Sequence, residues 1–180
     1  LSDDGARIAT VAGGQLVVWN ARTCAKLASH AIPRIAGFEF AGTTRDLIVV
    51  HESKLTRISE DAAAATGAFA GTPTRWAISP DGTQLALGAS KWLGDRHVTS
   101  LLVFDARTLT EQREIQLPMV DREIDGIAFA TDGKTAVVTV PIFGLNRWTQ
   151  LPVAHLAVEL ETATWKQRRK VQIPYGEPAR

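Results

Sequence analysis

Two segments of the chain combine aromatic and charged side chains in a way that is typical of binding surfaces. The first is residues 90–97, Ser-Lys-Trp-Leu-Gly-Asp-Arg-His, and the second is residues 141–150, Pro-Ile-Phe-Gly-Leu-Asn-Arg-Trp-Thr-Gln. Tryptophan and arginine dominate binding hot spots because they join a large apolar contact to directed hydrogen bonds. We therefore predict a surface that binds a protein or peptide, to which the nearby segment 119–123 also contributes. Its predicted residues are Trp92, Asp95, Arg96, His97, Arg122, Phe143, Asn146, Arg147 and Trp148.

Simpler roles are open for the same side chains. The two tryptophans could instead pack their segments onto the underlying fold. The two arginines could form ordinary surface ion pairs with Asp95 or Glu123. His97 could be a solvated loop histidine rather than a ligand or a base.

Motifs that carry catalysis are missing from the sequence. It contains no phosphate-binding loop that ends in Gly-Lys-Ser/Thr, no His-Glu-x-x-His and no Gly-x-Ser-x-Gly. Its single cysteine and four scattered histidines do not match the ligand spacing of a zinc site. We predict no catalytic residue, no metal and no cofactor from these patterns.

An internal repeat organises the chain. In three places a turn ending in Asp-Gly is followed by an apolar strand that ends in Asn, Asp or Glu, then by a second turn. A fourth unit lies between the first two and has Gly42-Thr43-Thr44 at its turn. In the last two units, Ile115 and Val171 are 56 residues apart, and so are Asp105 and Glu161. The repeated segments are Leu1–Gly5 with Val18–Thr23, Ile78–Gly82 with Val103–Thr108, and Phe129–Gly133 with Val158–Thr164.

Each unit is expected to form four antiparallel strands, from a short apolar strand a to a polar strand d. The third unit gives the pattern: 76–79, 84–88, 99–105 and 111–117. A tandem array of such units predicts an all-β fold, the β-propeller, in which strand a of each blade lines the centre. The four blades are expected at residues 1–34, 35–73, 74–119 and 120–180, the first with an incomplete strand a.

Four blades are fewer than most propeller rings contain. We expect them to be part of a larger ring, completed by another segment of the same protein, a second copy or another chain. A self-contained ring of four blades is the alternative.

The spacing within the units predicts where the two aromatic segments lie in the fold. The interval from the turn glycine to the end of strand c is 15 residues from Gly5, 23 from Gly82 and 28 from Gly133. Because the flanking strands keep their register, the extra residues are expected in long b–c loops. These loops emerge on the same face of a propeller as the d–a connections, and long loops on a rigid scaffold are typical of recognition sites.

The first unit resembles a bacterial WD40-type repeat in the broad sense, which includes propellers with a Ser-Pro-Asp-Gly turn. The residues that carry the resemblance are Ser2-Asp3-Asp4-Gly5, Gly13-Gly14, Val18-Trp19-Asn20-Ala21-Arg22-Thr23 and, in the third unit, Ser79-Pro80-Asp81-Gly82. This resemblance implies a sensing or scaffold module within a larger multidomain protein.

The amino-acid composition limits the classes of partner that the chain is expected to bind. The chain has 180 residues, is 45% hydrophobic and carries a net charge of +1, which fits a globular domain and argues against a dedicated nucleic-acid binder. The basic run 166–170 is expected on an outer strand, where charges protect a sheet edge from pairing.

No apolar run is long enough to span a membrane. One cysteine, Cys24, excludes an internal disulfide and favours a reducing compartment such as the cytoplasm.

The sequence leaves two further functions open beside a non-catalytic interaction module. Asp125 lies in an expected inner strand, 124–129, where its carboxylate could point into the central channel. A propeller enzyme, such as a lactonase-like hydrolase or a quinoprotein-like dehydrogenase, would use acidic residues there. A gating propeller attached to a peptidase would need a catalytic domain outside these residues.

Overall fold

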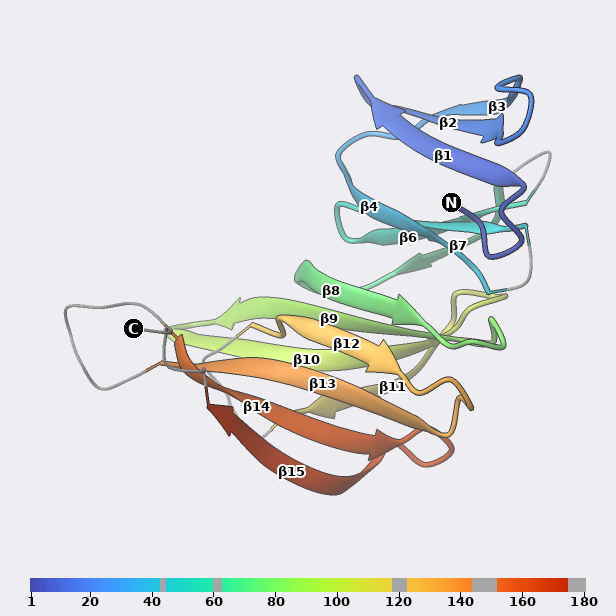
Figure 1. Cartoon of the computed structure of the whole chain (residues 1–180). Coiled ribbons are helices and arrows are strands. Elements are labelled where there is room, and N and C mark those ends of the chain that lie inside the picture. Colours follow the sequence, from blue (N-terminus) through green and yellow to red (C-terminus); the bar gives the residue numbers. More distant parts are fainter. Residues whose placement is uncertain (43–44, 60–62, 118–122, 144–151, 175–180) are drawn as a thin grey trace, which may run out of the picture.

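The described residues of the chain fold into a stack of antiparallel sheets (Figure 1). The computed structural model describes residues 1–42, 45–59, 63–117, 123–143 and 152–174. Within them, fifteen strands form four sheets, and inside each sheet consecutive strands pair with one another. This confirms the all-β propeller architecture that the repeat predicts.

The sheets follow the order of the repeat units. The first contains β1 (Arg7–Ala12), β2 (Gln15–Asn20) and β3 (Lys26–Ala31). The second contains β4 (Ile35–Phe40), β5 (Leu47–His51), β6 (Lys54–Ile58) and β7 (Ala63–Ala68). The third contains β8 (Thr72–Ile78), β9 (Gln84–Leu93), β10 (Arg96–Asp105) and β11 (Glu111–Gln116). The fourth contains β12 (Gly126–Phe129), β13 (Thr135–Phe143), β14 (Pro152–Glu161) and β15 (Lys166–Pro174).

Apolar side chains on both faces of the middle strands hold the stack together. On β5, Leu47 and Val49 pack toward the first sheet, whereas Ile48 and Val50 pack toward the third. All four are at most 1% exposed, as the unbroken apolar run 47–50 predicts. Burial of one such side chain stabilises the fold by about 1.5–3 kcal/mol. A third cluster, which includes Leu101, fills the space between the third and fourth sheets.

The a–b turns of the first and third sheets share one pattern of side-chain hydrogen bonds. In the third sheet, Ser79 Oγ donates to Asp81 Oδ1 at 2.6 Å, and the Gln84 N–H donates to Ser79 Oγ at 2.9 Å. Gly82 completes the turn with a left-handed φ of 68°. The serine hydrogen bond is the main cause that lowers the pKa of Asp81. The Ser-x-Asp-Gly pattern is therefore a structural device that starts strand b.

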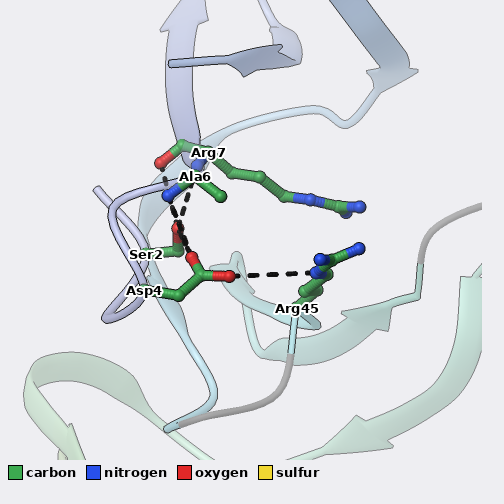
Figure 2. A network of polar contacts seen from close by, with 5 residues as sticks. All are labelled: Ser2, Asp4, Ala6, Arg7 and Arg45. Atoms are coloured by element: carbon green, nitrogen blue, oxygen red, sulfur yellow. Dashed lines mark hydrogen bonds and ion pairs between the residues drawn. The ribbon is translucent and has the colours of Figure 1, made fainter. Parts of the chain in front are cut away.

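Figure 2 shows the same device before β1. Ser2 Oγ donates to Asp4 Oδ1 at 2.6 Å, and the Arg7 N–H donates to Ser2 Oγ at 2.9 Å. The second oxygen of Asp4 lies 3.8 Å from Nε of Arg45, in the connection between β4 and β5 of the second sheet. The turn therefore also links neighbouring blades.

The extra residues of the third unit lengthen its strands instead of forming a long loop. Strands β9 and β10 pair without interruption up to Leu93 and Arg96, which leaves the two-residue turn Gly94–Asp95. Gly94 has a left-handed φ of 65°, which a tight hairpin turn requires. The prediction of a long loop over 90–97 is therefore wrong, because the ladder continues wherever side chains alternate and a glycine can close the turn. In the fourth sheet β13 likewise extends to Phe143, and residues 144–151 lie outside the described residues.

The inner strands lie side by side, with β8 between β4 and β12. Trp76 of β8 lies against Gly37 of β4, where a Cβ atom would come within 2.3 Å of the indole ring. Next to this contact, Glu39 of β4 is half-buried, and burial raises its pKa to about 7. A hydrogen bond from the Ile78 N–H opposes this rise, and the Asp3 carboxylate adds to it.

Glu39 predicts a pH-dependent loss of stability. Because its pKa in the folded chain lies above the ordinary value of 4.5, the folded state holds the proton more tightly than the unfolded state. Its contribution is complete below that ordinary value and is lost as the pH rises through about 7. The substitution Glu39→Gln should raise the free energy of unfolding on the order of 1–2 kcal/mol above neutral pH, and change it little in mild acid.

Urea unfolding of the wild type and Glu39→Gln, in mildly acidic and mildly alkaline buffer, measures this difference. Glu111→Gln, at an exposed position of β11, is the matched control and should show no such dependence. An equal effect of Glu39→Gln in both buffers would contradict the assignment.

Candidate binding surface

The β9–β10 hairpin presents an exposed tryptophan at its end. Trp92 on β9 lies directly opposite His97 on β10, and their rings meet edge to face with centroids 5.2 Å apart. The Trp92 residue is 71% exposed and its neighbour Leu93 is 55% exposed. Trp92 is thus held by one partner ring and does not pack onto a blade.

Polar side chains anchor the base of the hairpin. Ser100 Oγ donates to Glu114 Oε1 at 2.6 Å, and Lys91 Nζ lies 3.4 Å from the same oxygen. The Ser100 hydrogen bond is the main cause that lowers the pKa of Glu114. On the other side, Ser90 Oγ lies 3.5 Å from Glu123 Oε1, in the connection to the fourth sheet. The hairpin is therefore fixed both within its own blade and to the next.

The structure brings together part of the predicted surface. Asp95 and Arg96 are exposed at the hairpin tip, and His97 is half-buried beside Trp92. Among the residues that the structure describes, Arg96 forms no ion pair. Four of the predicted residues lie outside the described part of the chain: Arg122, Asn146, Arg147 and Trp148.

Phe143 and Asp125 belong to a separate pocket at the inner strands. Its volume is about 310 Å³, and it is lined by Thr74, Arg75, Glu123, Ile124, Asp125, Pro141 and Phe143. The sequence predicted that Asp125 lies within an inner strand, 124–129. In the structure Asp125 immediately precedes the inner strand β12. Arg75 Nε donates to the backbone carbonyl of Asp125 at 3.0 Å, and this hydrogen bond joins β8 to the start of β12.

Both carboxylate oxygens of Asp125 are engaged by side chains of its own sheet. Thr139 Oγ1 donates to Oδ1 at 2.6 Å, and His155 Nδ1 lies 2.8 Å from Oδ2. The Asp125 N–H also donates to the Thr139 carbonyl at 3.0 Å. The trio fastens the connection between the third and fourth blades to β13 and β14.

Asp125, His155 and Thr139 are the residue types of a catalytic triad, but they do not contact one another in the order that a triad requires. A carboxylate that orients a histidine is found in acyl-transfer enzymes, where the other ring nitrogen activates a hydroxyl. Here the Thr139 hydroxyl donates to the carboxylate instead. Within the described residues, no group of three or more histidine, cysteine, aspartate or glutamate side chains could hold a metal ion. Sequence reasoning missed His155, because only the pairing of β13 with β14 brings it to Asp125.

Another hollow opens at the other end of the strands. It measures about 610 Å³ and lies between the a–b turns of the third and fourth sheets, with Asp81, Asp132 and Lys134 in its wall. Its carboxylates already serve the turns: Asp81 bonds to Ser79, and Asp132 accepts from the Lys134 N–H at 2.9 Å. These side chains are therefore needed for the fold, and this hollow is the weaker candidate.

Comparisons with known proteins agree with this fold. No protein-family model matches the chain, and no curated protein has significant sequence similarity to it. Among solved structures, a chain of the mitotic checkpoint complex superimposes with a TM-score of 0.65 at 14% identity, covering 94% of this chain and 48% of its own. BamB from Moraxella catarrhalis superimposes with a TM-score of 0.57, also at 14% identity, covering 97% of this chain and 64% of its own.

The chain thus spans about half to two thirds of the length of these solved chains. Identity at this level speaks for the fold and not for an activity. No helix in the described residues has the length and apolar character needed to cross a bilayer. The sheets, their order and these two superpositions together establish that the chain has the β-propeller fold.

Proposed function

We propose that the chain is a non-catalytic interaction module that binds a protein or peptide through the tip of the β9–β10 hairpin. The observation that carries this proposal is the 71% exposure of Trp92 on a hairpin that polar contacts anchor to its blade. An exposed tryptophan held in place loses little conformational freedom on binding, so its apolar surface contributes more to affinity.

The surroundings of Trp92 support a polypeptide partner. Leu93 extends the apolar surface, whereas Asp95 and Arg96 supply one charge of each sign at its edge. An apolar centre with a polar rim is the usual composition of protein interfaces. Arg96 suits a carboxylate of the partner, because its guanidinium can donate two parallel hydrogen bonds.

The module works within a larger ring in this proposal. The missing blades come from another segment of the same protein, a second copy or another chain, and the whole acts as a sensing or scaffold unit of a bacterial protein. One of the two similar solved chains comes from a multiprotein complex, which is compatible with such a role.

Substitution of the hairpin tip tests the proposal. A library of random dodecapeptides is selected on the immobilised chain, and the affinity of the enriched peptides is measured by fluorescence polarisation. Trp92→Ala should weaken binding at least tenfold, or about 1.4 kcal/mol, and Arg96→Ala should weaken the binding of acidic peptides. Neither change should lower the thermal unfolding midpoint appreciably, because both side chains are exposed.

Val171→Ala provides the matched control. Val171 is an exposed apolar residue of β15, far from the hairpin in the sheet order, and its loss should leave peptide affinity unchanged. Peptides that bind wild type and Trp92→Ala equally would refute the proposed surface.

A second candidate function rests on the Asp125–His155 contact. A histidine oriented by a carboxylate close to a pocket could act as a general base in hydrolysis. Beside Asp125, only one other acidic residue, Glu123, lines the described pocket, so the residues present do not fit the metal site of a lactonase-like enzyme. Any hydrolysis would therefore depend on the Asp125–His155 pair itself.

Asp125→Asn separates the two functions. If the trio only fastens the blade, the substitution should lower stability by about 1–3 kcal/mol and leave both peptide affinity and any background cleavage of p-nitrophenyl acetate unchanged. If the pair is catalytic, the wild type should cleave the ester and Asp125→Asn should lose that activity. Asp132→Asn, which alters a turn carboxylate, serves as the control for both measurements.

A further inference from the structure

A mostly apolar pocket lies between the first and second sheets, away from the hairpin. Its volume is about 480 Å³, and its walls come from the end of β3 and the residues after it, and from β5, β6 and β7. Figure 1 shows the first sheet stacked on the second along this interface. The lining residues are Ser29, His30, Ala31, Ile32, Pro33, His51, Thr56, Ile58 and Thr66.

Two histidine rings in this pocket have a buried nitrogen without a hydrogen-bond partner among the described residues. His51 is only 8% exposed; its Nε2 lies 2.8 Å from Thr56 Oγ1, while its Nδ1 is unpaired. Nε2 of His30 is unpaired in the same way. A buried polar atom without a partner costs about 1–3 kcal/mol, so native proteins rarely keep one unless something satisfies it.

Equivalent positions in the other blades show which side chains fill such an interface when it has only a packing role. His51 is four residues beyond Leu47 on strand b, and the equivalent residues of the third and fourth sheets are Ala89 and Val140. Both of these are at most 3% exposed and belong to apolar clusters.

The same substitution pattern holds on strand c and across the interface. Thr56 stands where the third sheet has Leu102 and the fourth has Val158, both buried and apolar. His30, opposite Leu16 on β2, stands where the second and third sheets have a glycine and an isoleucine. At these equivalent strand positions, the interface between the first two sheets therefore has His51 and Thr56 where the third and fourth sheets have apolar side chains. Departures from a local rule of this kind are expected at functional sites.

The chemistry of the pocket selects its ligand. Burial lowers the pKa of His51, so its ring is neutral at physiological pH and offers one acceptor and one donor. Because the Thr56 hydroxyl can accept or donate, either tautomer is possible, and a hydroxyl group is the partner that satisfies both. The remaining walls, including Ile32 and Ile58, favour an apolar body. A transition-metal ion would use the imidazoles, but no third ligand accompanies them in the described residues.

We propose that the pocket between β3 and β5–β7 binds a small phenol-class molecule, an apolar ring whose hydroxyl groups hydrogen-bond to His30 and His51. This site is independent of the hairpin surface proposed above, since it lies between different blades. Both unpaired nitrogens are covered in the unliganded chain, so in this proposal the two rings turn toward the cavity when the hydroxyl groups bind.

The test is a titration of the full chain, carrying ¹³C-labelled histidine, followed by NMR of the imidazole resonances. Resorcinol is the probe, and 1,3-dimethoxybenzene is its matched control, because it keeps the ring and both oxygens but cannot donate a hydrogen bond. Resorcinol should shift the His51 and His30 signals saturably, and the ether should bind at least tenfold more weakly.

A variant that copies the third sheet provides a second, independent readout. In His51→Ala/Thr56→Leu, the pocket acquires the Ala89 and Leu102 side chains of the neighbouring interface. It should lose resorcinol binding, measured by calorimetry, and unfold at a temperature no lower than the wild type, because an unsatisfied polar group is gone. Glu111→Gln, an exposed substitution on β11 outside the pocket, should keep the wild-type affinity.

Three results would overturn the proposal. The first is the absence of a saturable shift up to the solubility limit of resorcinol. The second is equal affinity for resorcinol and the ether, which would mean that the pocket merely takes up apolar rings. The third is a joint shift of both histidines with Zn²⁺ but not with resorcinol, which would make the site a metal site.

Discussion

The rest of the structure depends on one constraint: sheets that are apolar on both faces must be covered on both faces. Val49 and Val50, neighbours on β5, are both fully buried because a sheet lies on each side of them. The outward face of the fourth sheet shows the same need unmet, since Val137 and Val171 there are 38% and 41% exposed. A further blade on that face is what the ring of a propeller supplies, and the described sheets form an open stack without one.

Much of this fold could be predicted because its turns are local. Ser79, Asp81 and Gly82 bond to one another and to the start of the next strand, so their pattern in the sequence specifies a turn wherever it recurs. The hairpin at Gly94 was harder to predict, since the choice between a loop and longer strands depends on cross-strand pairing. The contact of His155 with Asp125 is harder still: 30 residues separate them, and only strand register brings them together.

Covered faces and strand ends differ in how freely they can vary. A side chain such as Leu102 is enclosed by two sheets, and any change in its volume is opposed by close packing. The tip of β9–β10 has no such neighbours, so Trp92 can be exposed without weakening the stack. This difference explains why the candidate partner-binding residues gather beyond the ends of the core strands.

The interface between the first two sheets runs against that rule, and the repeat itself makes the exception visible. The neighbouring units provide internal controls: the position that is Ala89 in the third sheet and Val140 in the fourth is His51 in the second, with Thr56 beside it. Polar side chains in a covered face lower the stability of the fold. If they had no role there, they would be expected to face water. His51 is instead buried, and Thr56 half-buried, beside a cavity with apolar walls. A stack that needs only apolar filling at this position has therefore spent stability on directed hydrogen bonding, and recognition of a ligand is the property that such bonding provides and packing does not.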